Sequence, residues 1–279
     1  RQTDRQTDRQ TDRQTDRRTD YPLLLTGTID PKNGCSRERV AERLKEYEYA
    51  ITKYICETSF NPIVFAENSG YSFDEQKFKV MAEKNEKTFE YIKGTECFEE
   101  VKIHGKGYGE GLLIYEGLTK SRALKNVDIF YKMTGRIFLK NSKKIIKSRD
   151  IHRNEFISYD GMGWCMTYIF KSNKQDYIEI LGDIYKECDD KSVRDIEICT
   201  WLRLRDAKLD IGSFSVYPDI DGKMGDTENL YTRNQIERVL RTILIKLGIF
   251  TINTRTGNVF WNLYKLVTGR KAYATQNDI

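Results

Sequence analysis

Residue types that hold metal ions or form disulfides are scarce in this chain of 279 residues, which has two histidines and six cysteines. The cysteines are scattered and include no C-x-x-C pair, so the sequence predicts neither a zinc site nor a disulfide framework. Two histidines also offer little for a Ser-His-Asp or Cys-His catalytic set. We therefore expect a reducing, cytosolic environment.

Long apolar runs are absent as well. No stretch approaches the roughly 18 to 20 apolar residues that cross a bilayer, and the first residues lack the apolar core of a secretion signal. A glycine-rich stretch at 105–111 spaces its glycines by two, so it matches neither the G-x-G-x-x-G dinucleotide fingerprint nor a P-loop. The sequence therefore argues against a nucleotide triphosphatase.

Acidic residues are scarce in two windows of the sequence, 132–153 and 233–271. Each window has eight Lys/Arg against one acidic residue, although the net charge of the whole chain is only +5. Such segregation favours an anionic ligand or surface at the windows, and solvated helix and loop faces are the alternative. The end of the second window also mixes basic with aromatic residues, which is typical of a membrane-interface segment or of a helix packed on the domain.

The first 20 residues are a tetrapeptide repeat, RQTD four times followed by RRTD, without an apolar residue. Such a segment has nothing to bury, so we predict that it is disordered. The repeat can be encoded as AGA-CAG-ACA-GAC, in which the four-base unit AGAC recurs. Slippage by one such unit shifts the reading frame, which is how phase-variable genes for bacterial surface structures are switched. An ordinary low-complexity tail is the alternative.

The residues after the repeat alternate between predicted strands and helices, which is the pattern of an α/β domain. Apolar residues spaced by three and four predict an amphipathic helix over 37–57, and buried strands flank it, so a parallel pairing with a right-handed crossover is expected. The predicted helices span 37–57, 72–91, 112–125, 174–188, 192–204 and 232–248, and the predicted strands span 21–29, 61–66, 100–103, 127–131, 155–159, 166–170 and 211–216.

Four glycines, Gly105, Gly107, Gly109 and Gly111, follow the predicted third strand. We interpret them as a ligand loop over 104–111, because such glycines permit positive φ or a close approach of the backbone and the next helix offers its first amides to an anion. A tight loop without a ligand is the alternative. The loops at 26–30, 67–71 and 132–136 also follow predicted strands, so we expect all four to converge at the carboxyl edge of the sheet.

Four segments in this order carry a resemblance to a known family: LLTGTI at 24–29, IVFAENSGY at 63–71, GKGYGE at 105–110 and YKMTGR at 131–136. Together they resemble bacterial glycosyltransferases that build lipopolysaccharide, lipooligosaccharide or capsule, and the resemblance covers 22–230. It implies a GT-A-like, single Rossmann-type α/β domain with a mixed central sheet at 21–232. A helical, basic and aromatic C-terminal extension at 233–279 would follow.

The resemblance implies a nucleotide-sugar donor, whose departing diphosphate needs a metal ion or fixed positive charges. Metal-dependent GT-A enzymes usually carry Asp-x-Asp after the fourth strand, whereas this chain has Lys132-Met133-Thr134-Gly135-Arg136 there. We therefore favour Lys132 and Arg136 as charge partners of the donor. The predicted donor-binding residues are Thr26, Gly27, Asn68, Ser69, Gly107, Gly109, Glu110, Lys132, Thr134, Gly135 and Arg136.

A literal Asp-x-Asp occurs only late in the chain, at Asp219 and Asp221. These two residues are the candidate ligands for Mn²⁺ or Mg²⁺, although the sequence establishes no cofactor. Turns rich in Asp and Gly are common without a metal. A loop over 218–231 that closes on the donor is the favoured interpretation.

Sugar transfer with inversion needs a base for the acceptor hydroxyl. Glu197 lies among apolar residues of a predicted helix, where partial burial would raise its pKa, and it is the first candidate. Glu67, at a strand end, competes with it, and Asp160 is the third candidate. A helix-surface acid without a catalytic role is the alternative for Glu197.

These observations favour a glycosyltransferase that moves a sugar from a nucleotide-sugar donor to a lipid-linked, growing bacterial surface glycan. We expect it in the cytoplasm or on the inner face of the cytoplasmic membrane. The alternative is a non-catalytic nucleic-acid-binding protein that uses the windows 132–153 and 233–271, although no known reader motif accompanies them. A carbohydrate-modifying phosphotransferase is a second enzymatic alternative.

Overall fold

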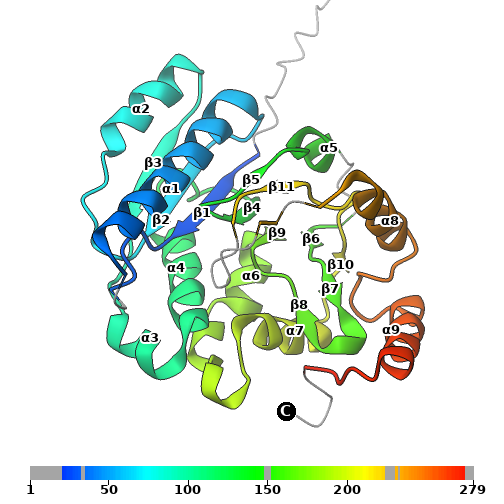
Figure 1. Ribbon diagram of the computed structural model, residues 1–279. Coiled ribbons are helices and arrows are strands. Elements are labelled where there is room, and N and C mark those ends of the chain that lie inside the picture. Colours follow the sequence, from blue (N-terminus) through cyan, green and yellow to red (C-terminus); the bar gives the residue numbers. More distant parts are fainter. Residues whose placement is uncertain (1–20, 33–34, 148–151, 224–229, 232, 274–279) are drawn as a thin grey trace, which may run out of the picture.

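The computed structural model describes residues 21–32, 35–147, 152–223, 230–231 and 233–273 (Figure 1). The predicted disordered repeat at 1–20 lies outside these described residues. Helices α1 Arg37–Glu57, α2 Glu75–Lys84, α3 Phe98–His104, α4 Lys106–Lys120, α5 Ser142–Lys147, α6 Lys174–Leu181, α7 Ile196–Asp206, α8 Gln235–Lys246 and α9 Arg255–Thr268 are joined by short 3₁₀ segments η1 Asp160–Met162, η2 Ile184–Glu187 and η3 Asp190–Ser192. The strands are β1 Leu23–Gly27, β2 Ile63–Glu67, β3 Phe89–Lys93, β4 Ile129–Thr134, β5 Phe138–Leu139, β6 Asn154–Glu155, β7 Ser158–Tyr159, β8 Trp164–Cys165, β9 Ile169–Asn173, β10 Ile211–Gly212 and β11 Ile220–Asp221.

Seven strands form the central sheet in the order β10-β6-β9-β4-β1-β2-β3. The strands β3, β2, β1 and β4 are mutually parallel, whereas β9 runs antiparallel to both β4 and β6. β1 and β2 are buried along their whole length, as expected for parallel strands that helices cover on both faces. The mixed sheet confirms the predicted fold class, a Rossmann-type α/β domain with a helical C-terminal part.

The two faces of the sheet carry different hydrophobic clusters. On one face Leu25 and Phe65 pack with Tyr47 and Ile51 of α1, and on the other Leu24 packs with residues of α4 and α7. Alternate residues of each strand therefore serve alternate faces, which is the geometry of a pleated strand. None of the helices in the described part of the chain is long and apolar enough to cross a membrane.

Several predicted elements are confirmed, and one is confirmed to the residue. α1 spans Arg37–Glu57 as predicted, because Ser36 caps its first turn and its apolar residues follow one helical face. α7 begins later than predicted, at Ile196, where the Asp195 carboxylate accepts the Ile198 N–H. The predicted cap Thr232 lies outside the described residues, and Asn234 caps α8.

The predicted third strand at 100–103 is wrong. Those residues lie in α3, whose first turn carries Glu99 and Glu100 and whose last turn carries Lys102 and His104, charges that suit the helix dipole. The third strand is β3 instead, and the helix predicted over 72–91 ends at Lys84 to make room for it. The predicted helix at 174–188 is likewise two pieces, α6 and η2, and the strands predicted at 155–159 and 211–216 shorten to two-residue segments.

The predicted glycine loop at 104–111 is also wrong. Gly105 has φ of 92° and separates α3 from α4, but Gly107, Gly109 and Gly111 lie buried inside α4. A Cβ on Gly107 would lie 3.0 Å from the Ile196 backbone nitrogen of α7, and one on Gly111 would lie 2.9 Å from Tyr185 Cβ. The glycines therefore let α4 pack closely against its neighbours rather than form an anion-binding loop.

Candidate functional site

The chain reverses its direction across the sheet between β1 and β4. From β1 the chain proceeds to β2 and β3 on one side, and β4 then adds to the other side of β1. In open α/β sheets, ligands bind outside the carboxyl ends of the strands at such a switch point. The turns after β1, β2 and β4 meet there, as the sequence predicts.

The turns after β1 and β4 contact each other directly. Gly135 N–H donates to the Thr26 carbonyl at 2.7 Å. A Cβ on Gly135 would lie 3.0 Å from that carbonyl oxygen and 3.1 Å from both the Phe65 and Tyr47 rings, so the close approach requires glycine. Thr134, the last residue of β4, is only partly buried beside this contact.

The turn after β2 is tied to the turn after β1 by side chains. Thr28 Oγ1 donates to Asn68 Oδ1 at 2.6 Å, and Glu67 Oε1 accepts the Ile29 N–H at 2.8 Å. Glu67 Oε1 also accepts the Ser69 N–H at 3.0 Å and the Ser69 hydroxyl. Burial raises the pKa of Glu67, while the hydrogen bonds from Ser69 and Ile29 oppose the rise. In this arrangement Glu67 holds two loops together beneath the surface.

Two arginines reach the switch point. Arg43 of α1 donates from Nε to the Ile29 carbonyl at 3.1 Å and from Nη2 to the Thr28 carbonyl, without an acidic partner among the described residues. Arg136 Nη1 lies 2.7 Å from Glu46 Oε2. Cationic groups of Arg39 and Lys223 lie 3.3 Å and 3.9 Å from the other oxygen of Glu46. Positive charge therefore exceeds negative charge around this carboxylate.

Arg39 and Arg43 were not among the predicted donor-binding residues. Both lie in the first two turns of α1, the helix that begins at the carboxyl edge of β1. The signal was their spacing by four, which places them on one side of the helix. The prediction of this helix rested on its apolar positions alone, and these two arginines lie on its polar side.

Lys132 lies beneath the switch point. Its side chain is fully buried, and its ammonium pairs with Glu110 of α4 and donates to the Thr167 carbonyl at 2.9 Å. Thr167 Oγ1 in turn donates to Glu197 Oε1 at 3.0 Å. The structure thus brings Glu110, Lys132 and Glu197 into one polar cluster. The predicted contact between Lys132 and a donor stays a prediction. The Lys132 side chain has no exposed surface here.

Glu197 lies close to the end of β4. The Tyr168 carbonyl, next to Thr167, accepts the Thr134 N–H at 3.0 Å, so one short segment connects the carboxyl of Glu197 to the strand end. Burial raises the pKa of Glu197 to about 8, with further contributions from the negative charges of Glu110 and Asp195. The carboxyl can therefore take or release a proton near neutral pH, which is what a general base requires.

Asp160 and the glycines of α4 make contacts that hold neighbouring elements of the fold together. Asp160 accepts hydrogen bonds from Trp201 Nε1 at 2.8 Å and from the Asn253 N–H at 3.1 Å, and burial raises its pKa. Gly107 and Gly109 are buried between helices. The predicted contact of Gly107 and Gly109 with a donor stays a prediction.

Asp219 precedes the two-residue strand β11, Asp221 is its second residue, and the two carboxylates have different partners. Asp219 pairs with Arg238 of α8 and lies 3.9 Å from Lys140 Nζ, whereas Asp221 Oδ2 accepts the Tyr49 hydroxyl at 3.2 Å. A divalent ion on Asp219 would have to displace these cations, so the pair fits a metal poorly as arranged. Across the described ranges, no three His, Cys, Asp or Glu side chains gather as a metal site.

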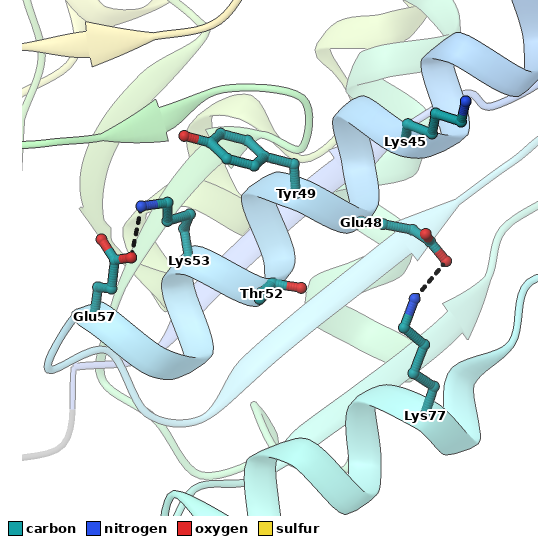
Figure 2. A pocket seen from close by; sticks show the side chains of 7 residues that line it. All are labelled: Lys45, Glu48, Tyr49, Thr52, Lys53, Glu57 and Lys77. Atoms are coloured by element: carbon teal, nitrogen blue, oxygen red, sulfur yellow. Dashed lines mark hydrogen bonds and ion pairs between the residues drawn. The ribbon is translucent and has the colours of Figure 1, made fainter.

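A surface hollow lies elsewhere, on the outer side of α1 beside α2. Figure 2 shows its lining, which consists of Lys45, Glu48, Tyr49, Thr52, Lys53, Glu57 and Lys77. Lys53 pairs with Glu57 at 2.6 Å and Lys77 with Glu48 at 3.1 Å. Because both glutamates of this lining are already paired with lysines on an open helix surface, we place no substrate there.

No protein-family model and no curated protein matches the sequence. Among solved structures, the chain is similar to a protein of Desulfovibrio desulfuricans G20 assigned as a nucleotide-diphospho-sugar transferase, with 13% identity and a TM-score of 0.44 over 68% of this chain and 78% of that one. It is similar to HddC from Yersinia pseudotuberculosis, with 11% identity and a TM-score of 0.39 over 72% and 93%. It is also similar to the bifunctional glycosyltransferase WbbM, with 8% identity and a TM-score of 0.46 over 85% of this chain and 46% of that one. Likenesses of this size carry no argument about activity.

Proposed function

We propose that this chain is a nucleotide-sugar-dependent glycosyltransferase whose donor binds at the switch point between β1 and β4. One observation carries the proposal: the turns after three adjacent parallel strands are bonded together there, with Arg43 and Arg136 beside them. The segments that resemble the surface-glycan glycosyltransferases at 24–29, 63–71 and 131–136 are these turns and the strands that end in them.

Fixed positive charge is the chemistry that this site offers. A nucleoside diphosphate leaving group gains negative charge as the bond to the sugar breaks, and preorganised cations stabilise that charge. Arg43 is held by two backbone carbonyls, so its position is set without an acidic partner. Arg136 shares Glu46 with two other cations. If a diphosphate takes over Arg136, Glu46 therefore still has cationic partners.

Glu197 is the proposed base for the acceptor hydroxyl. Its raised pKa keeps it protonated below about pH 8 and makes the carboxylate a strong acceptor above it. Glu67 is the weaker candidate, because its Oε1 already accepts three hydrogen bonds that shape the loops. No step of this proposal passes through Asp219, Asp221 or an Mn²⁺ or Mg²⁺ ion.

The finer parts of the proposal rest on the sequence. The resemblance supports a growing lipopolysaccharide, lipooligosaccharide or capsule as acceptor, linked to lipid at the inner face of the cytoplasmic membrane. The repeat at 1–20 supports phase variation of the gene. We also propose a catalytic domain at 21–232 followed by a C-terminal extension at 233–279.

The nucleic-acid-binding alternative is not favoured. In the first window, Lys132 is fully buried in an ion pair, and no known reader motif accompanies either window. In the second window, Arg233 and Arg241 both pair with Glu237. A phosphate backbone is read by exposed cations, and these three side chains are committed to ion pairs within the protein.

The test is donor binding and hydrolysis with a panel of UDP-, CMP-, GDP- and dTDP-sugars. We expect one donor class to bind, and Arg43→Ala or Arg136→Ala to weaken it by about 10- to 100-fold, the range for one charge-assisted hydrogen bond. Arg122→Ala is the matched control, because Arg122 is an exposed arginine at the opposite edge of the sheet. If no nucleotide sugar binds or is hydrolysed, the proposal fails.

A further inference from the structure

Helix α8 packs on the domain mainly with its polar side, to which only Ile245 and the partly buried Leu244 add apolar contacts. Arg241 donates to the Tyr159 hydroxyl at 3.1 Å, Thr242 Oγ1 accepts the Tyr217 N–H at 3.1 Å, and Arg238 pairs with Asp219. The apolar side is turned outward instead. Ile236, Val239, Leu240, Ile243 and Leu247 are between 48% and 74% exposed. This orientation is the reverse of the usual one for an amphipathic helix on a soluble domain.

Helix α9 continues the same exposed apolar surface. Trp261 anchors it in the core and donates to the Ile249 carbonyl at 2.9 Å. Val259, Leu263, Leu266 and Val267 are between 54% and 83% exposed. The beginning of α9 lies against the end of α8, since a Cβ on Gly257 would be 3.2 Å from the Gly248 carbonyl oxygen. Figure 1 shows both helices at one edge of the molecule, away from β1.

Unpaired cations lie on and beside these two helices. Lys246, Arg255, Lys265, Arg270 and Lys271 have no acidic partner in the part of the chain that the structure describes. In contrast, the cations of α8 that face the domain are paired. A helix that lies in a lipid interface typically exposes leucine, isoleucine and valine next to lysine and arginine without acidic partners.

We propose that α8 and α9 form a docking surface for an anionic lipid bilayer, with the exposed apolar side chains inserted among the acyl chains and the five unpaired cations at acidic headgroups. The inference stands on α8 and α9 alone and does not depend on the glycosyltransferase proposal. A second copy of this chain is disfavoured as the occupant, because it would bring two sets of unpaired cations together.

The test is sedimentation of the full chain with vesicles of equal parts phosphatidylglycerol and phosphatidylcholine. We expect binding that weakens in high salt and is lost on pure phosphatidylcholine. Leu240→Ser/Ile243→Ser should weaken binding by at least about tenfold, since burying one such side chain is worth about that factor. Ile103→Ser/Val80→Ser is the matched control, because both residues are exposed apolar side chains on other helices.

The charges have their own matched pair of variants. Lys246→Gln/Lys271→Gln should weaken binding about fivefold per residue. Lys143→Gln/Lys144→Gln, two exposed lysines of α5 in the other basic window, should leave it unchanged. Thermal unfolding of each variant shows that it is folded. The proposal is wrong if the wild type ignores anionic vesicles, binds neutral ones equally, or responds to the control variants as to the α8 variants. The proposal is also wrong if the wild type binds no vesicle and instead forms a dimer that the Leu240→Ser/Ile243→Ser variant no longer forms.

Discussion

Arg136 Nη1 lies 2.7 Å from Glu46 Oε2, so an ion pair joins the turn after β4 to helix α1 at the switch point. The arginine side chain is 3% exposed and the glutamate side chain 21%. The two residues are 90 positions apart in the sequence, and their contact fixes the turn that the donor is proposed to meet. Stability and donor binding therefore depend on the same arginine.

Replacing Arg136 with methionine should lower the free energy of unfolding by about 1–3 kcal/mol. Removing one partner of a buried pair leaves the other charge desolvated, but Glu46 keeps some solvent contact and Arg39, which reduces the loss. Urea denaturation measures the change. Arg122→Met, at an exposed position, should stay within about 0.5 kcal/mol of the wild type, and an equal loss in both variants would contradict the burial argument.

Glu197 should make stability fall as the pH rises. Its pKa is raised from 4.5 to about 8 in the folded protein, so between these values the folded state holds a proton that the unfolded chain has released. The protein therefore loses stability across that window, and Glu197→Gln lacks this loss. Relative to the wild type, the variant should gain on the order of a few kcal/mol between pH 5 and pH 9, as urea denaturation measures. Glu99→Gln, on an exposed residue of α3, should show no such trend.

If Glu197 is the base, sugar transfer should rise with pH to a midpoint near 8, where the carboxylate forms. Glu197→Gln should reduce the transfer rate about 10²- to 10⁴-fold, the usual contribution of a general base, while donor binding stays intact. The measurement is the pH profile of transfer under saturating donor. A full rate in Glu197→Gln would move the role to Glu67.

Gly107 and Gly109 of α4 should respond differently to alanine. Gly107→Ala should destabilise the protein by about 1–3 kcal/mol, because its Cβ meets the Ile196 backbone nitrogen at 3.0 Å and Cys188 Sγ at 3.1 Å. A Cβ on Gly109 would meet the Val101 side chain at 3.0 Å and Asn68 and Cys97 at the ordinary contact distances of 3.6 Å and 3.7 Å, and alanine favours the helix, so the cost of Gly109→Ala should be smaller. Thermal unfolding compares the two. Equal stability of the two variants would contradict this packing argument.

Donor hydrolysis should survive a chelator. Asp219 is paired with Arg238 and Lys140, so Asp219→Asn should act by leaving Arg238 without its partner and lower the unfolding midpoint. Hydrolysis with EDTA and then with added Mn²⁺ is the measurement, and Asp221→Asn is the companion variant. Activity that disappears with EDTA and returns with Mn²⁺ would restore these aspartates as metal ligands.

Local patterns determined much of this fold. The bounds of α1, the buried strands β1 and β2, and the turns after β1, β2 and β4 follow from apolar spacing, caps and glycines that are neighbours in the sequence. The direction of the pKa shift of Glu197 was also predicted from its apolar helix neighbours, although the charge of the distant Glu110 adds to it. These features depend on residues a few positions apart, so the sequence alone contains their cause.

Only the tertiary structure decided the rest. The segments at 89–93 and 100–103 both mix apolar with charged residues, and pairing with β2 selects the first as a strand. Gly107 and Gly111 lie in a helix because α7 and η2 approach it closely. Lys132 is buried because Glu110 and Thr167 neutralise and hydrogen-bond its ammonium from other elements. These outcomes depend on partners distant along the chain, whose proximity exists only after the sheet has formed.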